Sequence, residues 1–380
     1  MELPFCLTKE KQMAVGFPTK VNYATGDVLS ATNMNDLSGT VNILEGTQYS
    51  GGKNRVLNAA MQIAQRGTSF SLAASTAYTS GYILDRWQTA TGANQACTIA
   101  RQATGDTTNL PNIQYCLRYQ RNSGQTGTGI LYTMQSFESL NSIPLAGKQV
   151  TFSFYARAGA NYSAASSVLG AIVYSGTGTD QNGFTGLTGQ TAVIAQNATL
   201  TTTWQRFTYT GTVASTATQL LVQFTFTPTG TAGTNDYYEI TGVQLEASSV
   251  ASAFSTNGGT YQAELAACQR YYYRSTQTAI YANYGQGACY SATAATIFIK
   301  PPVSMRVTPT SVDFATIGNY RFWNSLIAVA ATGATIDTNA AGQDVLAINV
   351  TATAGLTNGS TVYFGANNNA ATYFGMSAEL

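Results

Sequence analysis

The sequence predicts an all-β protein with an extended N-terminal arm, an antiparallel jelly-roll β-sandwich and a second, C-terminal β-domain. Composition is the first observation, because 36 Gly, 23 Tyr and 16 Phe favour pleated strands joined by polar turns. The second is a series of short segments in which apolar and polar residues alternate between clusters of Gly, Thr, Asn and Ser. The third is the scarcity of long amphipathic helical patterns. With 380 residues, the chain is long enough for two or more domain cores.

Residues 1–52 are predicted to form the extended arm. This segment is rich in Asn, Thr, Ser and Gly and lacks a sustained apolar period, so it cannot bury much surface alone. We expect it to become ordered against a neighbouring protein, and a disordered leader is the alternative.

Residues 53–258 are predicted to form the jelly-roll sandwich. The clearest strands are 149–157 and 219–227, where Leu220, Val222 and Phe224 share one face. Further strands are expected at 130–136, 169–174, 206–210 and 237–245. Many short strands with Gly-rich connections are typical of a two-sheet antiparallel sandwich.

Residues 259–380 are predicted to form the second domain, also a β-sandwich, after a turn-rich joint at 255–259. A helix is expected over 260–274, where Leu265 and Cys268 lie on one face. Strands are then expected at 279–284, 295–300, 345–351, 361–364 and 372–378. Pro301, Pro302 and Pro309 mark an edge or a loop, because proline cannot donate to a central ladder.

The composition excludes several classes of function. The chain has no histidine and only 9% charged residues, so no Ser-His-Asp, Cys-His or His-based zinc site is available. We therefore expect no catalytic residues, no metal site and no cofactor, although a structural Ca²⁺ held by carbonyl and carboxylate oxygens stays open. A net charge of +1 without a basic run argues against a nucleic-acid partner, and no apolar stretch is long enough for membrane insertion.

The five cysteines are odd in number and widely spaced, without a CxxC pair. We expect them to be reduced and mostly buried thiols, in keeping with synthesis in a reducing cytoplasm.

Several segments of the sequence resemble motifs of a known protein family. Asn58 to Phe70 together with Tyr82 to Trp87 resembles the opening of the carbohydrate-binding-module-like jelly roll found in tail-fibre and minor structural proteins of tailed bacteriophages. Later phrases are similar as well: 145–148, 204–207, 243–246, 264–272, 302–310 and 377–380. Residues 17–44 look like an N-terminal segment of phage appendage proteins. The resemblance implies a virion location, a fibre-like and trimeric assembly, and an arm that attaches to other virion proteins.

Candidate site residues fall into two groups. Asp85, Arg86 and Trp87 form a structural signature in which an ion pair caps a core tryptophan, although a sugar-binding role is the alternative. Trp204 is expected in the core. The candidates for glycan contact are Trp323, Tyr320, Arg321 and Tyr272.

The sequence therefore predicts a virion structural protein, made in the host cytoplasm, rather than an enzyme. In this interpretation a fibre or appendage subunit, expected to be a homotrimer, attaches by residues 1–52 and contacts host surface polysaccharide. Two alternatives remain: a head or neck decoration protein without a receptor role, and a polysaccharide depolymerase, which needs only two carboxylates. The sequence separates neither tail from head position nor one host glycan from another.

Overall fold

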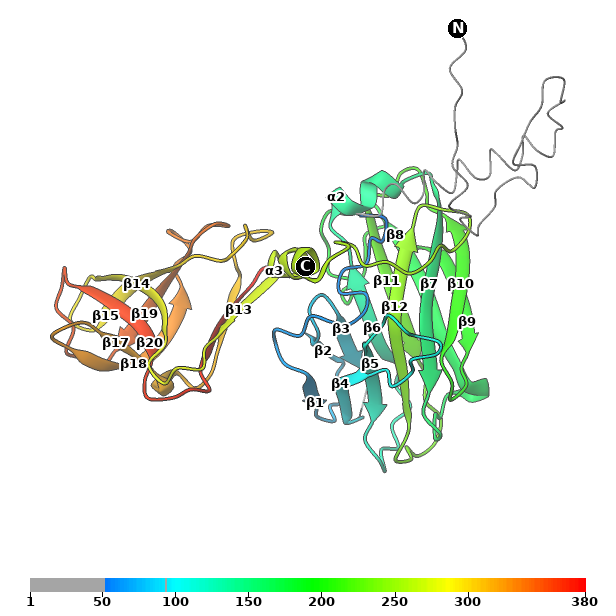
Figure 1. Ribbon diagram of the computed structural model, residues 1–380, viewed down its shortest axis with the longest axis horizontal. Helices are drawn as coiled ribbons and strands as arrows, with labels where there is room; N and C mark the ends of the chain where they lie inside the picture. The colour runs from blue at the N-terminus through cyan, green and yellow to red at the C-terminus, as the bar shows by residue number, and fades with distance from the viewer. Residues whose placement is uncertain (1–51, 93) are drawn as a thin grey trace, which may run out of the picture. The chain divides into compact units, whose positions relative to one another are not determined.

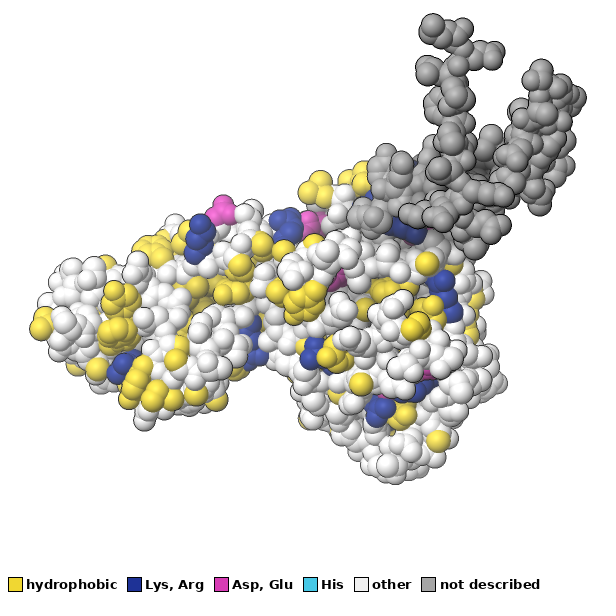
Figure 2. Space-filling model, viewed as in Figure 1, with side chains coloured by type: hydrophobic (Ala, Val, Ile, Leu, Met, Phe, Trp, Pro, Cys, Tyr) yellow, Lys and Arg dark blue, Asp and Glu magenta, His cyan; other side chains and the backbone are white. Residues whose placement is uncertain are grey.

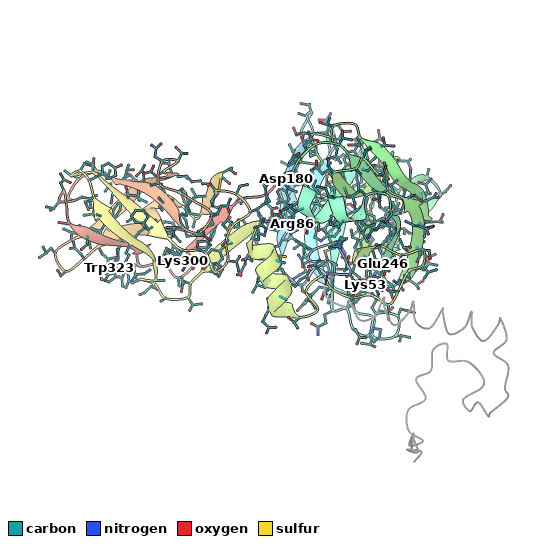
Figure 3. The ribbon with its side chains drawn as sticks, turned by 90° about the horizontal axis from the view of Figure 1, so that it is seen from above. Lys53, Arg86, Asp180, Glu246, Lys300 and Trp323 are labelled. Carbon is teal, nitrogen blue, oxygen red and sulfur yellow. The ribbon has the colours of Figure 1, made fainter. Side chains whose placement is uncertain are left out.

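The computed structural model describes residues 52–92 and 94–380. The arm predicted for residues 1–52 lies outside this range except for its last residue. Lys53 to Leu380 cluster as one unit. Lys53, near the start of the described chain, forms an ion pair with Glu246 at 3.4 Å (Figure 3).

Two antiparallel sheets face each other in the N-terminal part, which confirms the predicted sandwich (Figure 1). The first sheet has, in spatial order, β1 (Ser69–Leu72), β4 (Cys97–Ala103), β5 (Tyr115–Arg121), β12 (Tyr237–Glu246), β7 (Gln149–Ala158) and β10 (Gln205–Thr212). The second sheet has β2 (Thr79–Tyr82), β3 (Gln88–Thr91), β6 (Leu131–Ser136), β11 (Gln219–Phe226), β8 (Val168–Gly176) and β9 (Thr191–Thr199).

Aromatic side chains from both sheets fill the space between them. Phe224 of β11 lies 5.6 Å from Phe152 and 4.8 Å from Phe154 of β7, measured between ring centroids. All three rings are buried. Burial of one such ring stabilises the fold by about 1.5–3 kcal/mol, so this cluster holds the two sheets together.

Helical segments in the described residues are short. They are α2 (Ser139–Ser142), α3 (Tyr261–Gln269) and the 3₁₀ turns η1 (Ile143–Leu145), η2 (Ala165–Ser167) and η3 (Ile317–Asn319). Thr260 caps α3, because its side-chain oxygen accepts a hydrogen bond from the Ala263 N–H at 3.3 Å. The helix ends earlier than predicted, since Tyr272 already belongs to a strand. Within the described part of the chain, no helix is long and apolar enough to cross a membrane.

The C-terminal part contains a closed barrel, where the sequence predicted a second sandwich. The barrel strands are, in order, β14 (Asn283–Cys289), β15 (Ala294–Ile299), β19 (Leu346–Ala352), β18 (Ala328–Ile336), β17 (Tyr320–Trp323) and β20 (Thr361–Ala366). Because β14 pairs with both β15 and β20, no barrel edge stays free. Alternation in a sequence reveals which face of a strand is buried, but not which strand lies beside it.

A three-stranded sheet accompanies the barrel. It contains β13 (Tyr272–Thr276), β21 (Tyr373–Ser377) and β16 (Ser311–Phe314), with β21 in the middle. Its Phe314 and Phe374 rings stack at 6.2 Å, and Phe374 packs edge-on against Phe364 of the barrel at 6.0 Å. The sheet and the barrel therefore share one hydrophobic core.

Candidate functional site

A groove of about 450 Å³ lies on the outer face of the second sheet of the sandwich. Its lining comes from β6, β8, β11, the segment before β2 and the loop of residues 177–190. The lining residues are Tyr78, Tyr132, Met134, Tyr174, Gly183, Phe184, Thr185, Gly186, Gln190, Leu221 and Gln223.

The strand register explains the floor of the groove. On β11, Leu220, Val222 and Phe224 point into the sandwich core, so Leu221 and Gln223 point outward. Gln223 pairs with Met134 of β6, and Leu221 pairs with Tyr174 of β8. The alternation that builds the core therefore also builds the groove floor.

Tyrosine rings form one side of the groove. The Tyr78 and Tyr132 ring centroids lie 6.0 Å apart with an interplanar angle of 51°, and Tyr78 is 47% exposed. Partial burial, and then the neighbouring Tyr78 and Tyr174 hydroxyls, raise the pKa of Tyr132. These phenols offer hydrogen-bond donors and acceptors beside apolar ring faces.

Hydrogen bonds fix the loop of residues 177–190 in place as the opposite side. The Gly183 N–H donates to Ser136 Oγ at 2.8 Å, and the Phe184 N–H donates to Asn182 Oδ1 at 2.8 Å. Gln190 Oε1 accepts from the Leu187 N–H at 3.0 Å. A loop ordered before a ligand arrives loses little conformational entropy on binding.

None of the described residues that line the groove carries a charge. Exposed rings with amide and hydroxyl groups suit a neutral, polyhydroxylated ligand. Glycoside hydrolysis in its usual form needs two carboxyl groups beside the bond that is cleaved, and the lining residues contribute no such pair. The lining residues therefore offer a ligand apolar ring faces and uncharged hydrogen-bonding groups.

The predicted signature residues lie in the sandwich and are buried, as expected. Trp87 packs against Phe224 at 6.4 Å, and its indole N–H donates to the Asn58 carbonyl at 3.1 Å. Asp85 accepts hydrogen bonds from Gln65, whereas Arg86 forms its ion pair with Glu379. The ion pair predicted in this motif therefore joins Arg86 to the end of the chain and not to its neighbour Asp85.

Trp204 is also buried, but in a smaller apolar cluster with Ile113 and Cys116 and outside the main sandwich core. Its indole N–H donates to the Thr104 carbonyl at 3.2 Å, and the Arg157 guanidinium lies 4.8 Å from its ring centroid.

Two of the four residues predicted to contact a glycan are in the wrong place for that role. Tyr320 points into the barrel, where its ring stacks on Phe364 at 5.4 Å. Tyr272 is buried beneath the Arg66 guanidinium, 3.6 Å from its ring centroid, and its hydroxyl donates to Asp313 at 2.5 Å. Neither ring can reach a ligand, so the prediction is wrong for both.

The other two, Arg321 and Trp323, lie on the outer face of the barrel. Trp323 is labelled on the barrel in Figure 3. On β17 the side chains alternate, so that Tyr320 and Phe322 point inward while Arg321 and Trp323 point outward. Arg321 and Trp323 therefore lie close together on the barrel, whereas the groove residues belong to the sandwich.

No pattern in the sequence predicts the groove. Tyr132 and Tyr174 lie in strands that alternation identifies, yet only the pairing of β6, β11 and β8 brings them to one surface. As for metals, residues 52–92 and 94–380 contain no group of three or more His, Cys, Asp or Glu side chains that could hold an ion.

Neither a family model nor a curated protein matches the chain. Among solved structures, it is similar to a family 4 carbohydrate-binding module, with 16% identity, 50% of this chain and 98% of that chain covered, and a TM-score of 0.28. It is similar to the enzymatically active domain of tailspike protein 4 of bacteriophage CBA120, with 13% identity, 51% and 21% coverage and a TM-score of 0.31. A xylan-binding CBM22-1 domain from Paenibacillus barcinonensis has 13% identity, 53% and 98% coverage and a TM-score of 0.27.

Proposed function

We propose that this chain is a glycan-binding structural subunit of a tailed-phage virion, a fibre or appendage protein that recognises polysaccharide without cleaving it. The observation that carries the proposal is the uncharged groove, in which Tyr78, Tyr132 and Phe184 surround a floor that contains Gln223. Sugar rings have apolar C–H faces and hydroxyl edges, and this groove offers a partner for each.

The surface of the described chain supports a binding role for neutral ligands. Most of the surface seen in Figure 2 belongs to backbone and to uncharged polar side chains, with few charged groups. Such a surface creates little long-range field, so it neither steers nor repels an uncharged polysaccharide.

The virion assignment is supported by the sequence phrases of residues 58–70 and 82–87, which resemble tail-fibre and minor structural proteins. In this proposal, residues 1–52 dock on other virion proteins and the chain assembles as a trimer. Closed rotational symmetry is the usual arrangement for identical chains, and threefold symmetry is the expectation for fibres.

Affinity electrophoresis through gels that contain dextran, xylan, mixed-linkage β-glucan or galactan tests the groove. The full chain should be retarded by at least one polymer, and Tyr78→Ala should reduce this affinity by about tenfold, which corresponds to about 1.4 kcal/mol. Tyr261→Ala is the matched control, because Tyr261 is similarly exposed but lies on α3. Equal retardation of both variants, or none for the wild type, would contradict a glycan-binding groove.

Electron cryo-microscopy of particles labelled with an antibody to the chain tests the virion role. Label on a fibre or appendage supports it, and unlabelled particles contradict it. Deletion of residues 1–52 should prevent incorporation into particles while the β-domains stay soluble. Mass photometry of the intact chain should give a trimer.

A further inference from the structure

A second candidate site lies on the outer face of the barrel, away from the groove in the sandwich. It comprises Tyr281, Gln286, Phe298, Arg321, Trp323 and Tyr363, which we name the barrel platform. Three of its rings are well exposed: Tyr281 at 46%, Phe298 at 48% and Tyr363 at 41%. Scattered single aromatic residues are ordinary on a protein surface, but a contiguous set is not.

The strand register makes the set contiguous. Phe298 of β15 pairs with Gln286 of β14, which pairs with Tyr363 of β20. Tyr363 in turn pairs with Trp323 of β17. Neighbouring strands lie about 4.8 Å apart, so this row crosses four strands over about 14 Å.

The central rings are held in fixed orientations. The Trp323 ring stacks on Tyr363 at 4.8 Å between centroids, with an interplanar angle of 30°. Its indole N–H donates to Asn283 Oδ1 at 2.9 Å. A ring restrained by both contacts loses little freedom when a ligand stacks on it.

Arg321 adds a positive charge that nothing nearby neutralises. Its guanidinium lies 4.3 Å from the Tyr281 ring centroid and 5.7 Å from that of Trp323. Within the part of the chain that the structure describes, Arg321 forms no ion pair, and its Nε has no hydrogen-bond partner. The charge of this guanidinium is therefore available to an anionic ligand.

We propose that the barrel platform binds an acidic saccharide, with a sugar ring stacked on the exposed aromatic side chains and the sugar carboxylate paired with Arg321. A carboxylate matches the guanidinium in charge and in planar geometry. Gln286 lies between Phe298 and Tyr363 in the row, and this mixture of rings and polar groups suits the C–H faces and hydroxyls of a sugar better than an aliphatic protein anchor. The site goes beyond the function proposed for the groove, because it lies on another domain and selects a charged ligand.

Tryptophan fluorescence gives a direct readout on the unmodified chain. The protein has three tryptophans. Trp87 and Trp204 are 0% and 4% exposed, so quenching by acrylamide reports on Trp323. Titration with hexagalacturonate and with an α2,8-linked oligosialate should protect Trp323 for at least one of these probes. Maltohexaose, a neutral oligomer, should give no protection.

Calorimetric titration of variants then measures how much each platform residue contributes to binding. The ligand is the acidic oligosaccharide that protects Trp323 from acrylamide. Arg321→Gln should weaken binding by about tenfold or more, because a charge-assisted contact is lost, while Arg321→Lys keeps the charge and should lose less. Tyr363→Ala should also weaken binding. Tyr290→Ala is the matched control, since Tyr290 is an exposed barrel tyrosine outside the platform.

Four results would overturn the proposal: no protection by either acidic probe, equal protection by maltohexaose, unchanged affinity in Arg321→Gln, or concentration-dependent protection of Trp323 without sugar. The last result would assign the platform to contact between copies of the chain. Tyr78→Ala should leave acidic-probe binding intact, so failure of the groove and failure of the platform remain distinguishable.

Discussion

Arg86 of the sandwich and Glu379 near the C-terminal end of the chain form a buried ion pair, with side chains 1% and 5% exposed. Arg66 lies 3.3 Å from the same carboxylate. The Arg86 guanidinium also stacks on Tyr271, 3.6 Å from the ring centroid, and donates to the Ser136 carbonyl at 2.6 Å. Two arginines therefore share one carboxylate where the sandwich meets the C-terminal part.

Replacing Glu379 by Gln should destabilise the chain by roughly 3 kcal/mol, because loss of one partner leaves buried positive charge uncompensated. Urea denaturation followed by circular dichroism measures this change. Asp344→Asn is the control, since Asp344 is exposed and Asn keeps the oxygen that accepts from Ser304. If both variants unfold at the same urea concentration, the ion pair does not hold the junction.

Two buried carboxyl groups should give stability an unusual pH dependence. Burial raises the pKa of Asp85 above its ordinary value of 3.8 and that of Glu264 above 4.5. The folded state therefore binds protons more tightly than the unfolded state at these two sites. Their contribution to the free energy of unfolding is complete when the pH lies below the ordinary pKa values of 3.8 and 4.5. This contribution is lost as the pH rises through the folded-state pKa values.

Between about pH 4 and pH 7, the free energy of unfolding of the wild type should therefore fall relative to that of Glu264→Gln, which cannot titrate at this site. The slope is the informative quantity, because Glu264 accepts N–H donors from Asn58 and Gly258 and the variant also loses one acceptor. Parallel curves for wild type and variant would refute a raised pKa of Glu264.

The fold could be predicted from local alternation wherever a strand was long enough to show it. Segments 149–157 and 219–227 became β7 and β11 with nearly the same bounds. The four residues of β17 are too few for that pattern to stand out, so Tyr320 was assigned to the surface although it is buried. Arg321 and Trp323, the other two glycan-contact candidates on this strand, point outward.

Features that depend on pairing could not be predicted. The groove contains Tyr78, Tyr132 and Phe184, which come from separate segments of the chain. The barrel closes because β14 pairs with β20, which follows about 75 residues later. Arg86 has its charged partner 293 residues away, a separation at which sequence carries no pairing signal.

Four described cysteines should be unreactive in the native protein. Burial raises the pKa of Cys97 to about 12 and also raises the pKa of the Cys116, Cys268 and Cys289 thiols. Because the thiolate is the reactive form, these side chains should react slowly with an aromatic disulfide reagent. Cys6 lies outside the described residues.

Titration in denaturant without reductant should recover all five thiols of the sequence, since the four described cysteines are free. Titration of the native protein should recover far fewer in the same time. A denatured count of three or less would show disulfides and contradict this prediction.

The last prediction concerns Gly183, where the loop of residues 177–190 meets the groove floor. A Cβ at this position would lie 2.6 Å from Leu221 Cδ1 and 2.8 Å from Ser136 Oγ, which is too close for either contact. Because Leu221 and Ser136 are buried in the sheet, we expect the loop to move outward in Gly183→Ala and the hydrogen bond from the Gly183 N–H to Ser136 to weaken with it.

Gly183→Ala should cost about 1–3 kcal/mol of stability, as overpacking usually does, and should increase amide hydrogen exchange across residues 177–190. Its affinity for the polysaccharide that retards the wild type should fall, because Phe184 moves away from the tyrosines opposite. Gly318→Ala is the control, since a Cβ there meets no atom within 4 Å. Unchanged exchange and affinity in Gly183→Ala would mean that the loop does not set the width of the groove.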